Sequence, residues 1–453
     1  MQDSSASQAD SNTPSWPKPA VAWFGVGVLV VAFIFSIADR IIISLLVDPI
    51  KKDLNLTDTD MGLMMGLAFA IFYALMGLPI GRMADKYSRR TIIGVGIFLW
   101  SIMTALCGLA RSFTELFLAR VGVGVGEATL SPAAYSMIAD YFPKDKLGRA
   151  LGVYQSGAFF GVGLALIFGG LAIQFAATSD AISLPVVGVV APWQLAFMVV
   201  GLPGLFVAAL MFLVKEPVRQ GISLAKNDEI SMGQAFSFAF KRWRVYFAHY
   251  TGFALLALPM TTLATWVPAY FMRVVGFTPP ETGLKLGLII LIFSPIGVIG
   301  GGWLADILYK RGVKDAALRV AVATAACMVP LSIFATTISD PTWALVIIAP
   351  FAFGASISMG LAPTALQLVT PNRLRAQISA AWMLFLNLIT AGLGPTAVGW
   401  INDVVFGDPL AVGQSIAAVN TVAVFVGGII LWATWKPFRE AIDEQSVWSI
   451  CAS

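Results

Sequence analysis

Four charged side chains lie inside long apolar stretches of the sequence. Asp39 and Arg40 are adjacent within the run 23–47, and Arg120 and Glu127 lie seven residues apart in a later run. A charge near the centre of a bilayer is costly, so such residues pair with one another or bind protons, ions or ligands. Protonation of a carboxylate beside a guanidinium releases the guanidinium, which then binds phosphate or carboxylate groups in bidentate geometry. These four residues therefore indicate linked binding of protons and anions.

Helical geometry predicts how the four charges pair. Neighbouring residues on a helix point about 100° apart, so Asp39 and Arg40 do not face each other. A rise of about 1.5 Å per residue places Asp39 and Arg120 at one level, about 7 to 9 Å from the bilayer centre, with Glu127 near the centre. We therefore predict that Asp39 pairs with Arg120, and that Arg40 reaches Glu127 or binds a ligand.

The charges of this cluster add up to zero, and one added proton makes the cluster positive. We expect Glu127 or Asp39 to carry a proton and Arg40 or Arg120 to bind an anionic headgroup. The alternative is a purely structural clamp between the two helices. A charge-neutral replacement of Glu127 distinguishes these interpretations, because a clamp predicts unchanged pH dependence.

The composition indicates a polytopic membrane protein. Of the 453 residues, 58% are hydrophobic and 12% are charged, against about 25% charged in soluble proteins. The polar residues 1–20 lack the pattern of a signal peptide and predict a disordered cytosolic tail. The three cysteines are scattered, and no His, Cys or acidic cluster has metal-ligand spacing, so we expect no cofactor and no metal. No Gly-Lys-Ser/Thr nucleotide pattern is present, so ATP is not expected, and basic loops explain the net charge without nucleic acid.

The elements that position these charges are runs of about 20 apolar residues, each long enough to cross a bilayer as a helix. We predict an all-α membrane protein with twelve transmembrane helices. They lie near 22–47, 61–82, 91–110, 113–138, 149–173, 193–214, 244–271, 283–307, 317–337, 342–368, 376–400 and 413–435.

The distribution of lysine and arginine predicts the orientation of these spans. If both termini are cytosolic, 22 of the 29 basic residues lie in cytosolic segments and five lie on the opposite side. Basic residues are enriched in cytosolic loops. We therefore expect an even number of spans and cytosolic termini, and a bacterial inner (plasma) membrane location.

The longest loop divides the predicted spans into two sets of six. We predict a tail at 1–20, an N-terminal half at 21–214, a cytosolic linker at 215–243, a C-terminal half at 244–436 and a tail at 437–453. A weak repeat supports this division, because "GRMADKYSRR" (81–90) and "GGWLADILYKR" (301–311) follow the second span of each half. The linker stretch "GQAFSFAFKRWR" predicts either an amphipathic helix on the inner membrane face or a plain connection.

Several motifs resemble those of a known transporter family. "GRMADKYSRR" resembles the signature loop of the major facilitator superfamily, which implies the major facilitator fold. "FSIADR" (35–40), the stretch 119–143 and "GLGPTAVGWINDVVFG" (392–407) are similar to the Spinster branch of that superfamily. Animal members of this branch are associated with export of sphingolipid phosphates and lysophospholipids.

The signature loop predicts a latch between the two halves on the cytosolic side. An acidic residue there can cap a neighbouring helix and arginines can pair across the turn, while glycines allow close helix contact. The predicted latch residues are Gly81, Asp85, Arg89, Arg90 and Asp306.

The second half offers polar groups but no comparable buried charge. His249, the single histidine, is interpreted as a packed structural group or as a proton carrier. Tyr250, Thr261 and Asn387 are candidate polar groups of a substrate cavity, and the alternative for each is ordinary helix–helix bonding.

The leading prediction is a secondary active transporter that works by alternating access, is coupled to protons and carries an amphipathic anion of the lysolipid or sphingoid phosphate type. Ile37 and Ala38 replace the aromatic residue that Spinster-like proteins usually carry before Asp39. Small organic anions such as sugar acids are therefore the alternative substrates. A lipid enzyme would need a nucleophile–base or two-metal arrangement, so we expect no enzyme. A channel would not need the duplicated six-span plan. We expect the transporter to be a monomer in the membrane.

Overall fold

The computed structural model describes residues 16–178, 183–184, 188–219, 232–371 and 374–451. Most of these residues are helical, as the long apolar runs predict. The predicted disordered segment 1–20 and the centre of the predicted linker fall largely outside the described residues. The described part of the linker contains a helix, α11 (Met232–Lys241).

The N-terminal half is built from ten helices, one 3₁₀ turn and a small hairpin in the described residues. They are α1 (Pro19–Ile41), η1 (Ile42–Leu45), α2 (Val47–Leu54), α3 (Asp58–Met65), α4 (Leu67–Lys86), α5 (Arg89–Cys107), α6 (Phe113–Glu127), α7 (Leu130–Tyr141), α8 (Lys144–Thr178), β1 (Ser183–Leu184), β2 (Gly188–Val189), α9 (Pro192–Gly201) and α10 (Pro203–Met211). The two strands are antiparallel, with Ser183 opposite Val189.

The C-terminal half is also helical and contains several π-helical turns. Its elements are α12 (Trp243–Thr265), α13 (Val267–Tyr270), η2 (Phe271–Val275), α14 (Pro279–Lys310), α15 (Ala316–Phe334), α16 (Pro341–Val369), α17 (Arg375–Asn387), η3 (Leu388–Leu393), α18 (Gly394–Trp400), η4 (Ile401–Phe406), η5 (Pro409–Ala411), α19 (Val412–Ala433) and α20 (Trp435–Cys451).

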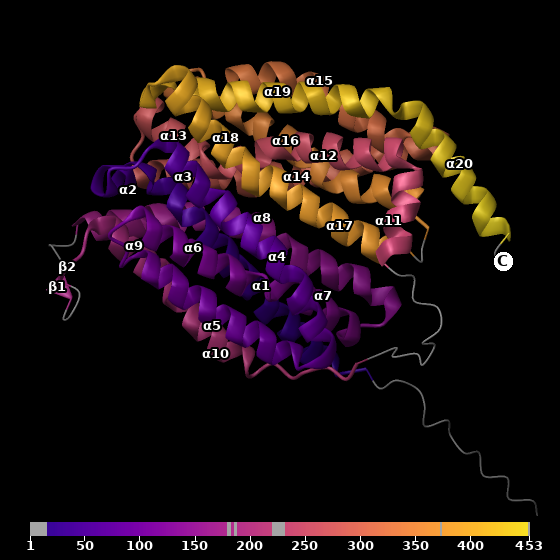
Figure 1. The fold of residues 1–453 in the computed structure, drawn as a ribbon, viewed down its shortest axis with the longest axis horizontal. Helices are drawn as coiled ribbons and strands as arrows, with labels where there is room; N and C mark the ends of the chain where they lie inside the picture. The colour runs from indigo at the N-terminus through magenta and orange to yellow at the C-terminus, as the bar shows by residue number, and fades with distance from the viewer. Residues whose placement is uncertain (1–15, 179–182, 185–187, 220–231, 372–373, 452–453) are drawn as a thin grey trace, which may run out of the picture.

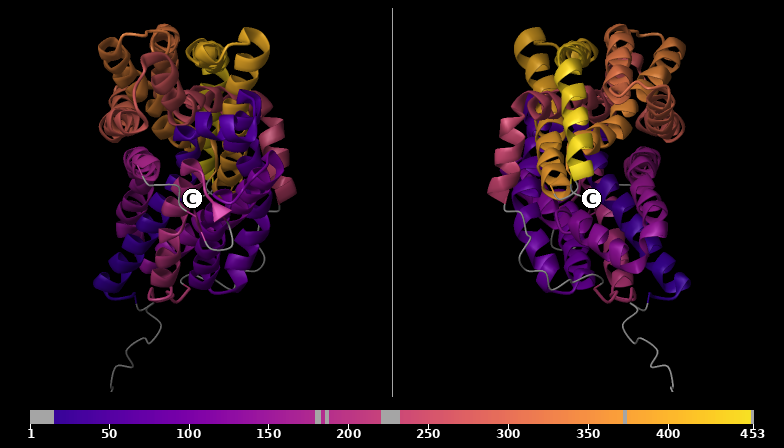
Figure 2. Two further views of the ribbon diagram at one scale, coloured as in Figure 1. Left: turned by 90° about the vertical axis from the view of Figure 1, so that its left-hand side faces the viewer. Right: turned by 90° about the vertical axis from the view of Figure 1, so that its right-hand side faces the viewer.

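The two halves lie against each other as two stacked bundles (Figure 1). The N-terminal half, indigo to magenta, lies below the orange and yellow C-terminal half, and Figure 2 shows the same division from both ends. The helix pair α8 and α14 joins the halves on one side, and α3 and α18 pack together at one end. We call the end that carries α2 and α3 the far end and the end that carries α11 the linker end.

In the described residues, ten helices are long and apolar enough to cross a membrane, or eleven if the bent pair 243–265 and 267–275 is one span. The predicted fourth span, 113–138, is divided between α6 and α7 at Ala128 and Thr129. Pro132 explains the break, because it lacks the N–H that would bond the carbonyl of Ala128. The number twelve and the orientation of the termini stay predictions.

Contacts between the halves are tight toward the far end. A Cβ at Gly283 would lie 2.2 Å from the carbonyl oxygen of Leu166, and one at Gly66 would lie 2.5 Å from that of Gly392. Only glycine permits backbones to approach this closely. A Cβ at Gly81 would instead meet no atom within 4 Å. The halves are therefore joined firmly at the far end in this conformation.

Candidate functional site

The charged residues of α1 and α6 meet in the interior of the N-terminal half. Arg40 Nη2 donates to Glu127 Oε2 over 2.5 Å, and the Ser36 hydroxyl donates to the same oxygen over 2.6 Å. Ser36 and Arg40 are four residues apart and share one face of α1. The predicted contact between Arg40 and Glu127 is therefore present.

An aromatic surface on α4 supports the Arg40 guanidinium. Its carbon Cζ lies 4.0 Å from the centroid of the Phe69 ring and 5.7 Å from that of Tyr73. These rings are four residues apart on one helix face, and a guanidinium over a ring gains cation–π attraction. The Arg40 side chain is 22% exposed, whereas the Glu127 side chain is fully buried. Arg40 is thus held in place and still accessible.

The predicted side-chain pair between Asp39 and Arg120 is wrong. Arg120 Nη1 donates to the backbone carbonyl of Asp39 over 2.9 Å, and Nη2 donates to that of Arg40 over 3.5 Å. These carbonyls lie where α1 gives way to the 3₁₀ turn η1, and carbonyls in the last turn of a helix lack intrahelical partners. Arg120 therefore caps the C-terminus of α1. The predicted depth places Arg120 beside Asp39 as the structure does, but Arg120 bonds the backbone carbonyl of Asp39 and not its carboxylate.

Asp39 is fully buried beside these charges. Its carboxylate oxygens make no hydrogen bond in the described part of the chain. The charges of Glu127 and Arg120 act on it, and the Thr104 hydroxyl of α5 is a close polar neighbour. The four predicted residues thus form one cluster, in which Arg40 is the exposed member.

The predicted latch residues Arg89 and Arg90 bond α7 and the start of the predicted linker. The Arg89 side chain is buried and donates to Glu216 over 2.9 Å, and to Ser136 and Asp140 of α7. The backbone N–H of Arg90 donates to Glu216 over 2.8 Å. Ser136 and Asp140 belong to the N-terminal half and Glu216 lies at the start of the predicted linker, so these bonds do not reach the C-terminal half in this conformation. A latch between the halves in another conformation stays a prediction. Glu216 instead caps the N-terminus of α5, where an anion is favourable.

The other predicted latch residues are not among the described bonding partners of Arg89 and Arg90. A Cβ at Gly81, or at Gly302 in the second copy of the repeat, would meet no atom within 4 Å. Asp306 is exposed at the end of α14. The side chain of Asp85 lies outside the described groups. The expected close packing at these glycines is therefore absent in this conformation.

Replacing Glu216 by Gln is expected to lower the melting temperature most near neutral pH. Burial alone would raise the pKa of Glu216, but hydrogen bonds from Arg90, Arg89 and Ser88 outweigh it and hold the pKa below its usual value. The fold therefore favours the charged form, and its contribution is complete above the ordinary pKa and is lost as pH falls through the lowered one. We expect a loss of about 1 to 3 kcal/mol at pH 7.

The measurement is thermal unfolding of both proteins between pH 7 and pH 3 in the same detergent. Glu440→Gln is the matched control, because Glu440 is exposed on α20. A difference between wild type and Glu216→Gln that stays constant with pH would contradict this assignment.

The polar candidates of the second half are packed among aromatic rings or bonded to their own helices. His249 is buried, with the rings of Phe253 and Trp382 at 4.9 and 5.0 Å between centroids. The Tyr250 hydroxyl donates to the carbonyl of Ile378 over 2.6 Å and so joins α12 to α17.

Asn387 donates to Met383 O over 2.9 Å, and the Thr261 carbonyl accepts from Thr265. Within the described chain, neither residue hydrogen-bonds to the cluster of α1 and α6. The Asn387 bond is the ordinary helix-internal alternative, whereas the role of the Thr261 hydroxyl stays a prediction.

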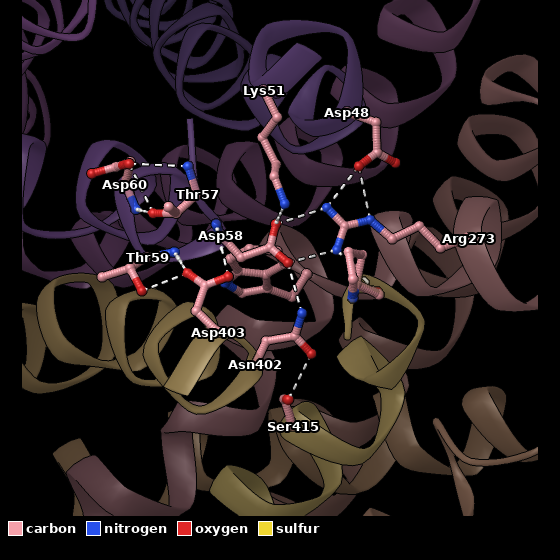
Figure 3. A network of polar contacts seen from close by, with 12 residues as sticks. Asp48, Lys51, Thr57, Asp58, Thr59, Asp60, Arg273, Asn402, Asp403 and Ser415 are labelled. Carbon is pink, nitrogen blue, oxygen red and sulfur yellow. Dashed lines mark hydrogen bonds and ion pairs between the residues drawn. The ribbon is translucent and has the colours of Figure 1, made fainter. Parts of the chain in front are cut away.

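A second polar network joins the two halves at the far end (Figure 3). Its centre is Asp58, at the start of α3, whose side chain is fully buried. Arg273 donates to both oxygens of Asp58 over 2.8 Å, Lys51 donates over 2.5 Å and Asn402 over 2.7 Å. Arg273 also bonds Asp48 over 2.8 Å. Arg273 and Asn402 belong to the C-terminal half, so this carboxylate binds both halves together.

Asp403 adds a second bond across the same interface. One carboxylate oxygen accepts from the backbone N–H and the hydroxyl of Thr59 over 2.5 and 2.6 Å, and the other accepts from the N–H of Asp58 over 3.3 Å. An anion at a helix N-terminus bonds free N–H groups and interacts well with the helix dipole. The far end is therefore closed by charges from both halves (Figure 3).

Sequence reasoning missed this network. Two of its cations, Lys51 and Arg273, are among the few basic residues on the side opposite the predicted cytosolic loops. Asn402 and Asp403 lie in the stretch "GLGPTAVGWINDVVFG" that carries the family resemblance. A search for acidic partners of those scarce cations at the same ends of the spans would have found it.

Comparison with known proteins agrees with this fold. The Major Facilitator Superfamily pattern matches residues 28–395. An MFS-type efflux pump of Mycolicibacterium smegmatis is 30% identical over 433 residues, 94% of this chain and 96% of that protein. The hexuronate transporter of Bacillus subtilis is 26% identical over 421 residues, 88% of this chain and 94% of that protein.

The fold of this chain is similar to that of a solved Spinster homologue. The crystal structure of a bacterial homologue of the human lysosomal transporter Spinster, inward-facing and unoccupied, is 25% identical to this chain. The match has a TM-score of 0.77 and covers 94% of this chain and 98% of that one. The chain therefore belongs to the Major Facilitator Superfamily of membrane transporters, as a Spinster-like member.

Proposed function

We propose that this protein is a proton-coupled secondary transporter that carries an anionic substrate bound by Arg40. The observation that carries the proposal is the Arg40–Glu127 ion pair, in which the guanidinium is partly exposed and the carboxylate is buried. A substrate phosphate or carboxylate can take the place of Glu127 on Arg40, because guanidinium binds both in bidentate geometry. Protonation of Glu127 favours this exchange.

Alternating access requires that the two ends open in turn, and the far-end network supports this. The positive-inside distribution predicts a cytosolic linker end, and with that orientation a closed far end corresponds to an inward-facing state. This agrees with the conformation of the Spinster homologue described above. Asp39 is the second carboxylate of the cluster and the alternative proton carrier, and Arg120 serves as the cap of α1.

The leading substrate class is an amphipathic anion such as a lysolipid or sphingoid phosphate. The rings of Phe69 and Tyr73 lie beside Arg40, and the partly buried rings of Tyr250 and Phe385 lie on the contacting helices α12 and α17. We infer that these rings supply apolar surface for such a molecule. Small sugar acids are the second candidate, favoured by the similarity to a hexuronate transporter along most of the chain. Both classes present the anion that Arg40 would bind.

Arg40→Gln is expected to weaken binding of the anionic substrate by about 30-fold or more, because a charge in a desolvated ion pair is lost. Arg40→Lys is expected to retain part of the affinity, since ammonium keeps the charge but not the planar fork. The measurement is saturable uptake of labelled lysophosphatidate and labelled glucuronate into liposomes, with and without a pH gradient.

Arg111→Gln is the control, because Arg111 is an exposed arginine just before α6. Saturable, gradient-dependent uptake of one anion supports a carrier and selects its substrate class. Flux that does not saturate, or Arg40→Gln uptake equal to wild type, contradicts the proposal.

A further inference from the structure

Helix α11 lies across the ends of the spans at the rim of the molecule. In Figure 1 it stands nearly at right angles to the long helices beside it, and Figure 2 shows it upright at the outer edge in both views. A helix at right angles to the spans, near their ends, lies in the plane of the membrane surface. The ten residues of α11 are directly followed by α12, the first span of the second half.

The side chains of α11 fall into a protein face and a lipid face. Phe238 packs against the ring of Tyr246, 6.0 Å between centroids, and under the Arg242 guanidinium at 4.5 Å. Phe236 and Phe240 lie on another side, about 160 to 200° around the helix, and are 62% and 79% exposed. Two neighbouring phenylalanines this exposed on one helix face require an apolar environment outside the protein.

This apolar face continues along α12. Trp243 and Phe247 are 54% and 58% exposed and follow Phe240 along the chain. The surface is thus continuous with the outward face of a membrane-spanning helix. Aromatic side chains gather at the boundary between headgroups and acyl chains, which places α11 at that depth.

Basic residues border the aromatic face. Lys241 and Arg244 are exposed, and in the described part of the chain neither forms an ion pair. Arg242 differs, because its guanidinium bonds Glu444 of α20 over 2.8 Å. Two cations are therefore left beside the aromatic surface, at the level where lipid phosphates lie.

We propose that Phe236, Phe240, Lys241, Trp243 and Arg244, here called the α11 surface, bind anionic phospholipids of the leaflet at the linker end. The rings enter the acyl boundary, and the two cations bind the phosphates. The Phe238–Tyr246 packing and the Arg242–Glu444 pair fix α11 to the C-terminal half. The membrane surface thereby anchors this half directly. This inference concerns the lipid environment and is independent of the transported substrate.

The first test compares binding of phosphatidylglycerol and phosphatidylcholine by native mass spectrometry of the full-length protein. The double variant Lys241→Gln/Arg244→Gln is expected to weaken phosphatidylglycerol binding about fivefold for each charge removed, with phosphatidylcholine binding unchanged. The matched control is Lys310→Gln/Arg311→Gln, which removes two exposed charges at the end of α14. An equal loss in the control, or no loss in the double variant, overturns the proposal.

The second test measures depth in vesicles of phosphatidylcholine and phosphatidylglycerol. Spin labels are placed at Phe240→Cys and Ser237→Cys in a background with Cys327→Ser and Cys451→Ser. These positions differ by about 60° around α11. The label at 240 is expected below the phosphates, accessible to oxygen and shielded from a water-soluble nickel complex, whereas the label at 237 lies nearer to water. Equal exposure of both labels to the nickel complex overturns the proposal.

Discussion

Glu127→Gln is expected to abolish uptake driven by a proton gradient and to raise the apparent affinity for the anionic substrate about tenfold or more. The neutral amide cannot carry the proton, and it no longer competes as an anion for Arg40. Close buried charge pairs couple by about 1.5 to 7 kcal/mol, and about 1.4 kcal/mol corresponds to a factor of ten. Substrate binding and gradient-driven uptake in liposomes measure the two effects separately.

The matched control is Glu115→Gln on the same helix. Glu115 accepts from the Arg111 backbone N–H at the exposed start of α6, away from the cluster, so gradient-driven uptake should persist. If Glu127→Gln keeps the uptake and pH response of the wild type, the ion pair is a structural clamp. In that case Asp39→Asn decides whether the second carboxylate carries the proton.

Asp58→Asn is expected to open the far end. This change removes the charge that neutralises Lys51 and Arg273 inside the network (Figure 3). Loss of one partner of a buried ion pair costs about 3 to 5 kcal/mol, enough to shift a two-state equilibrium by more than a factor of a hundred. Spin labels at Lys52→Cys and Asp408→Cys, one in each half, should therefore show longer distances in the variant.

Asp60→Asn is the control for this experiment. Asp60 lies two residues from Asp58, but in the described part of the chain its carboxylate accepts hydrogen bonds from Thr57 of the same cap and from no member of the far-end network. It should leave the far-end distances unchanged. Identical distance distributions for wild type and Asp58→Asn would refute the gating role of this network.

Much of the fold follows from the sequence because the forces that form spans act locally. Apolar runs enter the bilayer, and each predicted run corresponds to helix in the structure. Pro132 shows the limit, since it divides the fourth run into α6 and α7. A charge in such a run is energetically costly and therefore uncommon. The sequence alone thus identifies the members of the cluster, which are Asp39, Arg40, Arg120 and Glu127.

Bond partners depended on the tertiary structure. The levels of Arg120 and Asp39 follow from the rise per residue, but the sequence does not show that η1 frees the carbonyls that Arg120 binds. Arg89 likewise bonds Glu216, 127 residues away at the start of the linker, and this bond does not reach the C-terminal half. Side-chain partners over such separations depend on how whole helices pack.

The sequence by itself determined the membrane class, the family and the charged residues of the N-terminal interior, because hydrophobicity, motifs and the cost of buried charge are readable residue by residue. Only the tertiary structure decided which end is closed. Asp58 and Arg273 are 215 residues apart and Asp58 and Asn402 are 344 apart, so their bonds exist only when the two halves pack at the far end. The closed conformation is therefore a property of that packing, and the proposed transport cycle requires the same sequence to open there as well.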